Sequence, residues 1–220
     1  MTPGERWLTA IWPLVQEQLP GPPATVIDLG CGPLGGFVPM LLAAGYGAVG
    51  VDPEAPNESH YQRVEFERAE LPTPVDAVVA STSLHHVADP GTVIDGMVGA
   101  LAPGGIVVVV EWASERFDEA TARWCFERLG AEEGWLHGLR DEWRSSALDW
   151  PSYLDSWLER EGLHAGERLV RLLDERLERR ALAQGPYFFS DLTATEAEEQ
   201  AAIDAGRIQP NRIDYVGMRT

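Results

Sequence analysis

The sequence predicts an α/β protein built around a mostly parallel, doubly wound β-sheet. Short runs of β-branched residues alternate with segments of helical periodicity, and this alternation is typical of strand–helix–strand units with right-handed crossovers. A glycine-rich turn follows the first such run, and an acidic residue ends the second run about twenty residues later. Open sheets of this kind bind ligands at the carboxyl ends of their strands, so both features lie where a site is expected.

The elements follow one another in the order that this fold requires. Residues 1–19 carry apolar side chains at helical spacing and predict an amphipathic helix. The first four predicted strands lie at residues 26–29, 48–51, 64–66 and 75–80. A helix over residues 90–101 then ends at a Pro-Gly-Gly turn, and the β-branched run 106–110 predicts a fifth strand that is buried on both faces.

Residues 112–185 interrupt this alternation and hold six of the eight tryptophans of the chain. The helices predicted there lie at residues 117–129, 152–161 and 167–184. The remaining predicted elements are a strand at 187–189, a helix at 195–205 and a strand at 213–218. We therefore expect a single domain over residues 1–220, with 112–185 as a helical insertion or lid that lines an aromatic, apolar pocket.

Composition narrows the class of protein. The chain of 220 residues is 45% hydrophobic, has no run long enough to span a membrane and has no basic-then-apolar leader, so we expect a cytoplasmic protein. Its formal charge is −18, with 35 acidic residues against 17 basic ones, all Arg, and this balance argues against a nucleic-acid partner. The cysteines show no metal-ligand spacing, nor do the histidines apart from one adjacent pair, and the acidic residues show none that favours a metal-assisted enzyme, so no metal is expected.

The glycine-rich turn contains Asp28, Gly30, Gly32 and Gly35, and two classes of cofactor compete for it. The glycine spacing also matches the dinucleotide fingerprint, but a carboxylate at Asp28 would lie beside a pyrophosphate and repel it. A cofactor with a cationic amino-acid tail would be attracted to the same charge. Asp52 ends the second strand and is placed to accept hydrogen bonds from a ribose diol. These features favour an adenosyl cofactor with a cationic tail over NAD.

Four segments resemble, in order and spacing, the motifs of class I S-adenosylmethionine-dependent methyltransferases that act on small molecules. They read VIDLGCGPLGG, AVGVDPEAP, VDAVVASTSLHHVAD and LAPGGIVVVVEW. The resemblance covers residues 24–112 well and 186–218 loosely. It implies a Rossmann-like, seven-stranded sheet with strand order 3-2-1-4-5-7-6 and an antiparallel seventh strand. It also implies S-adenosylmethionine as the cofactor, with S-adenosylhomocysteine as its product.

The resemblance implies roles for individual residues. The methionine part of the cofactor would lie against Asp28, Gly30 and Gly32, and the ribose against Asp52. The other implied cofactor contacts are Pro53, Glu67 and Arg68 near the adenine and Ser81 near the sulfonium. The chain departs from the family pattern twice. Its turn carries one extra residue, which displaces the third glycine, and a Glu-Arg pair stands where the family usually has an acid and an alanine.

Methyl transfer from a sulfonium needs alignment and a dry site, and an oxygen or nitrogen acceptor can also need a base. His85 and His86 follow the fourth strand and are the candidate general bases. A packing role for either ring, and catalysis by proximity alone, stay open. The arginines of the insertion that are candidates for binding an anionic substrate are Arg116, Arg123, Arg140 and Arg144.

These observations together predict a methyltransferase that acts on an oxygen or nitrogen of a small, partly aromatic or apolar metabolite. Secondary metabolism would fit such a substrate. We expect no nucleic-acid or membrane partner, and a homodimer is an open possibility. Two alternatives remain: an NAD(P)-dependent oxidoreductase, and a non-catalytic methyltransferase-like module whose altered turn no longer binds the cofactor.

Overall fold

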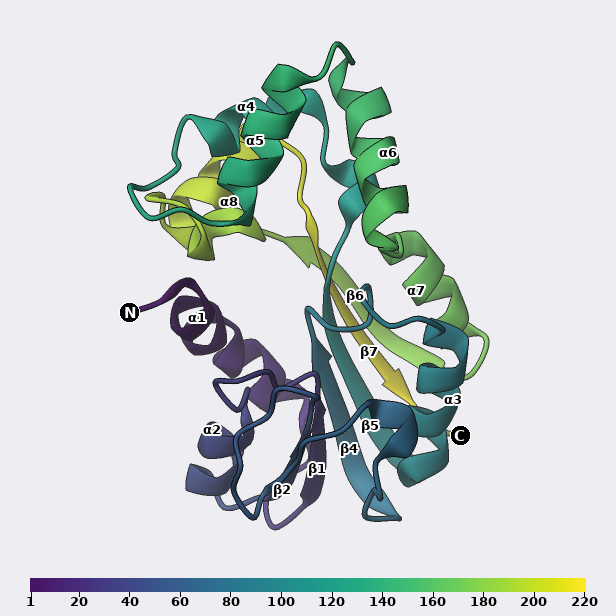
Figure 1. Ribbon diagram of the computed structural model, residues 1–220. Coiled ribbons are helices and arrows are strands. Elements are labelled where there is room, and N and C mark those ends of the chain that lie inside the picture. Colours follow the sequence, from purple (N-terminus) through teal and green to yellow (C-terminus); the bar gives the residue numbers. More distant parts are fainter.

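The centre of the computed structural model is a seven-stranded sheet, and residues 1–220 are described except for the side chain of Glu67. The strands are β1 (Thr25–Leu29), β2 (Gly47–Val51), β3 (Tyr61–Gln62), β4 (Val75–Ser81), β5 (Leu101–Trp112), β6 (Glu178–Gly185) and β7 (Arg212–Met218). They lie in the order β3-β2-β1-β4-β5-β7-β6 (Figure 1). The first five strands are parallel, whereas β7 runs antiparallel to both β5 and β6. The predicted fold class, strand order and antiparallel last strand are confirmed.

Helices cover both faces of this sheet and one end of it. They are α1 (Pro3–Gln18), α2 (Val38–Ala43), α3 (Pro90–Ala100), α4 (Glu119–Phe126), α5 (Trp135–Ser145), α6 (Trp150–Glu161), α7 (Gly166–Asp174) and α8 (Glu196–Asp204). Three short 3₁₀ helices are η1 (Phe66–Arg68), η2 (Ser114–Arg116) and η3 (Phe188–Ser190). Helices α1 and α2 pack on one face and α3 and α7 on the other, while α4, α5, α6 and α8 form a layer beyond the carboxyl end of β5 (Figure 1).

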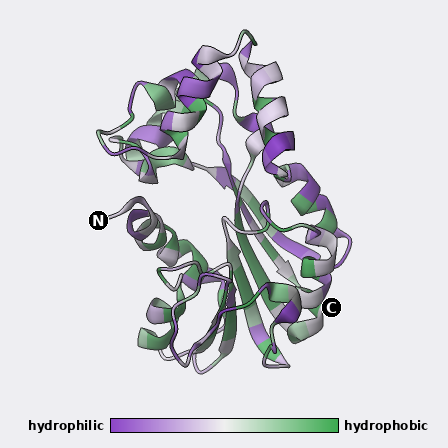
Figure 2. Cartoon of the chain, viewed as in Figure 1, coloured by the Kyte–Doolittle hydropathy of each residue, from purple (hydrophilic) through white to green (hydrophobic). Residues whose placement is uncertain are grey.

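The valine run of β5 explains why both faces are covered. Val107 and Val109 belong to the core beneath α3 and α7, whereas Val108 and Val110 belong to the core beneath α1 and α2. All four side chains are at most 1% exposed. Side chains alternate between the two faces of a strand, so a continuous β-branched run has two apolar faces to bury. Figure 2 accordingly shows the central strands as hydrophobic over most of their length.

The layer beyond β5 has its own apolar core and its own helix caps. Trp150 is 1% exposed at its centre and donates a hydrogen bond from Nε1 to the carbonyl of Phe117, over 2.6 Å. Asp118 is the N-cap residue of α4 and Asp149 that of α6, because each carboxylate accepts a hydrogen bond from a backbone N–H in the first turn. Helix α5 was not predicted, and it buries Leu136 and Leu139 against the same core.

Three predicted elements are wrong in place or type. The third strand is Tyr61–Gln62, three residues before the predicted 64–66. The helix predicted to end at residue 184 ends at Asp174, and β6 follows it. Residues 187–189 enter η3 rather than a strand. The segment 178–185 is rich in strong helix formers, but backbone pairing with β7 outweighs this local preference.

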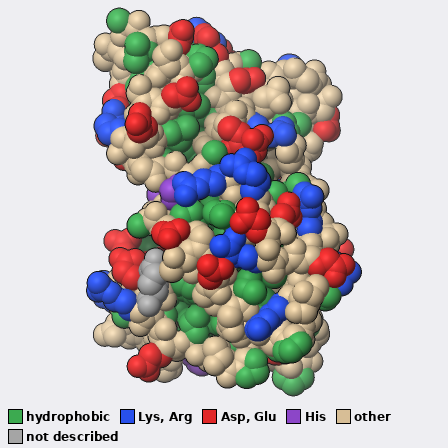
Figure 3. All heavy atoms as spheres, turned by 90° about the vertical axis from the view of Figure 1, so that its right-hand side faces the viewer, with side chains coloured by type: hydrophobic (Ala, Val, Ile, Leu, Met, Phe, Trp, Pro, Cys, Tyr) green, Lys and Arg blue, Asp and Glu red, His purple; other side chains and the backbone are tan. Residues whose placement is uncertain are grey.

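The surface of the sheet edge and of the helices is strongly charged. Strand β6 is an edge strand and exposes Arg179 and Arg180, which hinders pairing with another strand. Figure 3 shows acidic and arginine side chains interspersed on the face toward α3, α6 and α7, where Arg176 pairs with Asp95 at 2.5 Å. Among the described residues, no helix has the length and apolar character needed to cross a lipid bilayer.

Candidate functional site

The loop after β1 borders an open cavity of about 200 Å³, which we call the turn cavity. Gly30 and Gly32 line it with backbone φ angles of 75° and 60°, which residues with a Cβ rarely adopt. A Cβ at Gly30 would collide with the Ser83 side chain, whereas a Cβ at Gly32 would enter open space. The turn therefore brings bare backbone to the cavity surface at Gly32, where a ligand can approach closely.

Asp28 lies beneath this turn and is only 2% exposed. Its carboxylate accepts a hydrogen bond of 2.6 Å from the backbone N–H of Phe37, at the start of α2. Burial, together with the nearby Asp52 carboxylate, raises the pKa of Asp28 to about 7, although the N–H groups of Phe37 and Val38 oppose this shift. A cation bound in the turn cavity would favour the ionised form of this carboxyl group.

The carboxyl ends of β1 and β2 border a second cavity of about 710 Å³, which we call the strand-end cavity. Asp52 and Pro53 line it, as the sequence predicts, together with Gly30 and Gly32. Asp52 is half-buried, and its Oδ1 accepts a hydrogen bond of 2.7 Å from the backbone N–H of Glu54. Within the described part of the chain its Oδ2 has no hydrogen-bond partner, so this oxygen is available to a ligand.

The residues after the third strand lie differently from the prediction. Arg68 is exposed and does not line the strand-end cavity, and the side chain of Glu67 lies outside the described residues. Glu65 and Phe66 line the cavity instead. The sequence analysis missed both because it placed the third strand three residues too late. Ser81, predicted to lie near the sulfonium of the cofactor, lines the turn cavity, and its hydroxyl accepts a hydrogen bond of 3.0 Å from Trp7 Nε1.

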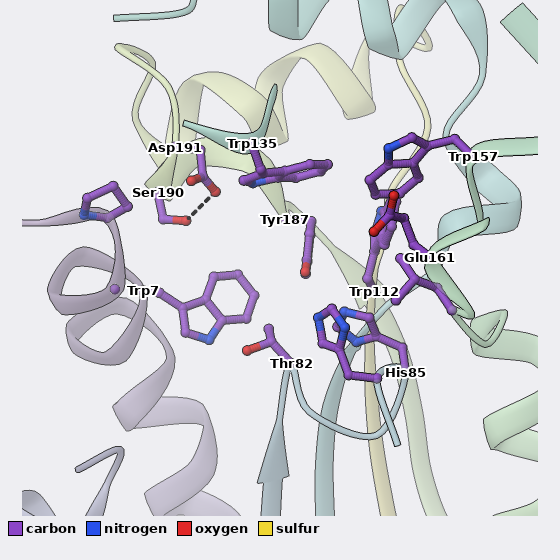
Figure 4. Close-up of a pocket in the computed structure, with 14 residues that line it drawn as sticks. Trp7, Thr82, His85, Trp112, Trp135, Trp157, Glu161, Tyr187, Ser190 and Asp191 are labelled. Carbon is purple, nitrogen blue, oxygen red and sulfur yellow. Dashed lines mark hydrogen bonds between the residues drawn. The ribbon is translucent and has the colours of Figure 1, made fainter. Parts of the chain in front are cut away.

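A third cavity of about 470 Å³ lies between the sheet and the helical layer (Figure 4), and we call it the aromatic cavity. Its rings come from α1, β5, α5, α6 and the segment before η3: Trp7, Trp112, Trp135, Trp157 and Tyr187. Trp112 stacks on Tyr187 with ring centroids 5.9 Å apart and meets Trp135 edge-on at 5.6 Å. From the sequence, Trp7 is expected only to be one of the apolar residues of the amphipathic helix at 1–19.

Two carboxylates, Glu161 and Asp191, also line the aromatic cavity. Burial raises the pKa of Asp191, while the Trp135 indole, the Ser190 hydroxyl and the Arg6 charge oppose this shift. None of the arginines predicted to bind an anionic substrate lines this cavity. Arg123 pairs with Glu119 instead, on another part of the helical layer.

Thr82 is the one lining residue, among those described, that the three cavities share. It follows β4 directly and has a φ angle of 51°, a left-handed conformation that costs a residue with a Cβ about 1–2 kcal/mol. Its backbone N–H donates a hydrogen bond of 2.8 Å to the carbonyl of Val110 in β5. The strained backbone thus lies at the point where the three compartments meet.

His85 is held by a buried glutamate that the sequence analysis missed. Glu111 is 1% exposed at the end of β5, and its Oε1 accepts hydrogen bonds from the backbone N–H groups of Ser83 and Leu84. Its Oε2 lies 2.5 Å from His85 Nδ1. A carboxylate only accepts, so Nδ1 carries the proton and Nε2 of His85 is left as an acceptor at the aromatic cavity. The only sequence signal was an acid at the end of an apolar run.

His86 packs against His85 with ring centroids 4.1 Å apart and lines both the aromatic and the strand-end cavities. Although the residue is exposed at the cavity surface, desolvation by its neighbours and the adjacent His85 lower the pKa of His86 to about 4, while Glu111 opposes the shift. His86 is therefore neutral near pH 7 and is a weak base. Among the described residues, no group of three or more His, Cys, Asp or Glu side chains is placed to hold a metal ion.

Comparison with known proteins decides the family. A family model described as a methyltransferase domain matches residues 6–166, a span that contains β1 to β5 and most of the residues that line the three cavities. The chain belongs to this methyltransferase family. The predicted family and enzyme class are thereby confirmed, and the Gly30–Gly32 turn and the Asp52 strand end that led to the prediction both lie within the matched span.

The relatives of this methyltransferase include an enzyme named ubiquinone biosynthesis O-methyltransferase from Xylella fastidiosa strain 9a5c. It is 28% identical over 168 residues, which covers 68% of this chain and 65% of the relative. The match therefore spans slightly less than two thirds of that relative's length.

Two solved structures share the fold. An S-adenosylmethionine-dependent methyltransferase from Mesorhizobium loti has a TM-score of 0.59 and 20% identity, over 96% of this chain and 98% of the other. A geranyl diphosphate C-methyltransferase from Streptomyces coelicolor, solved with Mg²⁺, geranyl diphosphate and S-adenosyl-L-homocysteine, has a TM-score of 0.59 and 15% identity, over 98% and 80%. At these identities the likeness is one of fold, and it agrees with the predicted class I methyltransferase sheet.

Proposed function

We propose that this chain is an S-adenosylmethionine-dependent methyltransferase that acts on an oxygen or nitrogen of a small molecule bound in the aromatic cavity. The arrangement of three cavities around Thr82 is the observation that supports this proposal most strongly. A nucleoside, an amino-acid tail and an acceptor would each have a compartment, and the three compartments meet at one point. In-line transfer of a group between two bound molecules requires such a junction.

The residues present fit this cofactor. Asp52 has a carboxylate oxygen available for the ribose hydroxyls, and Phe66 and Pro53 offer apolar surface to the adenine. The open backbone at Gly32 would let the methionine part lie close to the turn. Asp28 would attract its ammonium group. A dinucleotide would instead bring its pyrophosphate to this carboxyl group, which argues against the oxidoreductase alternative.

When bound, S-adenosylmethionine supplies an electrophilic methyl group on a sulfonium centre. The aromatic walls would exclude water from the acceptor. His85 would take the proton of the acceptor hydroxyl or ammonium on Nε2, because its Nδ1 proton is committed to Glu111. Glu111 would fix the ring orientation and stabilise the imidazolium that forms. We assign the base to His85 rather than His86, since Glu111 holds the Nδ1 side of the His85 ring, whereas desolvation lowers the pKa of His86 to about 4.

A label-transfer assay tests this function. The full chain is incubated with S-adenosylmethionine labelled in its methyl group and with a panel of small phenols, carboxylic acids and amines. We expect label in at least one small molecule, suppressed by S-adenosylhomocysteine. His85→Gln should lower turnover by about 10²-fold or more without weakening S-adenosylhomocysteine binding, because it removes the base and keeps the fold.

His137→Gln is the matched control, since His137 lies on α5 outside the aromatic cavity. Turnover of His85→Gln within about twofold of wild type would reject the assignment of the base. Label in protein or nucleic acid but in no small molecule would reject the small-molecule function.

A further inference from the structure

The walls of the aromatic cavity have a composition that methyl transfer alone does not require. Five Trp and Tyr rings, two His rings and two carboxylates line the cavity, no Lys or Arg is among the described lining residues, and Leu163 is the only Leu, Ile, Val or Met there. We infer that the cavity binds a positively charged amine or ammonium group, so that the acceptor substrate is a cationic small molecule. This inference rests on the proposed function and names the substrate class of the same site.

The ring geometry suits a cation. Trp112 is inclined by 68° to Trp135 and by 70° to Trp157, so its indole forms a wall at a steep angle to the other two. Trp135 and Trp157 are stacked, with their planes 26° apart and their ring centroids 6.4 Å apart. Trp135 is 37% exposed and Trp157 is half-buried, and both rings line the cavity. The face of an indole carries partial negative charge and attracts a cation within about 6 Å of the ring centroid, more strongly than any other side-chain ring.

Glu161 supplies negative charge on the α6 side of the cavity. Its Oε1 accepts a hydrogen bond of 3.1 Å from Arg160 Nε, and the same guanidinium pairs with Glu142 at 2.8 Å. One arginine is therefore shared between two carboxylates, and the cluster keeps a net negative charge. Arg160 itself does not line the cavity.

Asp191 supplies negative charge from the opposite side in Figure 4, beside Ser190 and Trp135. The nearest arginine, Arg6 of α1, donates hydrogen bonds to the backbone carbonyls of Ser190 and Leu192 and lines a neighbouring cavity rather than this one. Its charge offsets part of the Asp191 charge, and Asp191 lines both this neighbouring cavity and the aromatic cavity. An anionic acceptor would meet two carboxylates and no lining arginine, and a cationic acceptor would meet both carboxylates and the ring faces.

Two probes of equal shape, one charged and one neutral, separate the contribution of charge to binding from that of apolar contact. Choline carries a quaternary ammonium, and 3,3-dimethylbutan-1-ol replaces its nitrogen by carbon. Binding of each is measured by calorimetry to the full chain saturated with S-adenosylhomocysteine, which we expect to occupy the turn and strand-end cavities. We expect choline to bind at least about tenfold more tightly than the neutral alcohol, because cation–π attraction and the carboxylates act only on the charged probe.

Two pairs of variants locate the binding. Trp157→Leu should weaken choline binding by about five- to tenfold, whereas Trp143→Leu, in the same helical layer but outside the aromatic cavity, should leave it unchanged. Glu161→Gln should weaken the binding of choline but not of the alcohol. Glu159→Gln, on the same helix and outside the cavity, should affect neither.

Equal affinity for the two probes, tighter binding of the alcohol, or no choline binding to the S-adenosylhomocysteine complex would overturn the cationic substrate class. Equal losses of choline affinity in Trp157→Leu and Trp143→Leu would overturn the assignment of the cation site to the aromatic cavity. Both failures leave the proposed function standing as long as S-adenosylhomocysteine binds. Failure of S-adenosylhomocysteine itself to bind would reject the proposed function.

Discussion

Two buried carboxylates beside the cavities are held in different ways, and the difference sets their chemistry. Glu111 accepts hydrogen bonds from three backbone N–H groups and from His85, so its charge is well satisfied. Asp28 has a short hydrogen bond from Phe37, but it is buried near Asp52, and the pKa of Asp28 rises to about 7. We infer that Glu111 has a positioning role, whereas Asp28 responds to whatever cation enters the turn cavity.

This difference predicts a pH dependence of cofactor binding. Below about pH 7 the raised pKa leaves Asp28 protonated and neutral, and above it the carboxylate attracts the ammonium of the cofactor. Affinity for S-adenosylhomocysteine should therefore rise about tenfold between about pH 6 and pH 8. Calorimetry across this range should show a much flatter profile for Asp28→Asn. Asp149→Asn, at a distant helix cap, should behave as wild type. A profile unchanged in Asp28→Asn would contradict the role of this residue.

At the scale of elements, the site is built where the segment after β4 meets the end of β5. The backbone N–H of Thr82 donates to the carbonyl of Val110, and the next two backbone N–H groups along the chain donate to the Glu111 carboxylate. These hydrogen bonds connect the segment after β4 to the end of β5. This pairing fixes the left-handed backbone of Thr82 and the orientation of His85 together. Loss of the glutamate would leave buried N–H groups without partners.

Glu111→Gln should lower the free energy of unfolding by about 1–3 kcal/mol, because the amide accepts through only one oxygen and places an NH₂ group where an acceptor is needed. Glu115→Gln is the control, since Glu115 is exposed although it also accepts from the backbone N–H groups of Gly166 and Glu167. Its effect should stay within about 0.5 kcal/mol. Urea denaturation measures both, and equal effects would contradict the buried role of Glu111.

The elements with a strong local signal could be predicted from the sequence, and those fixed by tertiary pairing could not. The valine run of β5 requires burial on both faces, and the capping box at Thr195 marks the start of α8. In contrast, residues 178–185 read as helix and become a strand only through pairing with β7. The short β3 has two residues, too few for any periodicity to be read.

The candidate site divides in the same way. The glycine turn and Asp52 could be found because one strand–turn–helix unit and one strand end place them. The rings of the aromatic cavity come from five separate segments, so no local pattern connects Trp7 with Trp157 or Tyr187. Only tertiary packing brings these rings together.

At the scale of the whole molecule, the sheet and the helical layer line different cavities. The turn and strand-end cavities lie at the carboxyl ends of the parallel strands, and the helical layer contributes Trp135 and Trp157 to the aromatic cavity. We propose that residues 112–185 act as a lid through their helices, while β6 at the end of this range belongs to the sheet. Movement of this layer would admit the acceptor without disturbing the cofactor cavities.

Calorimetric titration of the full chain with S-adenosylhomocysteine, with NAD as the competing ligand class, tests the central claim most directly. We predict one S-adenosylhomocysteine bound per chain, no NAD binding, and affinity weaker by about 1–3 kcal/mol in Asp52→Ala, which loses the ribose contact. Glu58→Ala, at an exposed position on the loop between β2 and β3, should bind as wild type. Binding of NAD in place of S-adenosylhomocysteine, or an affinity unchanged by Asp52→Ala, would contradict the account.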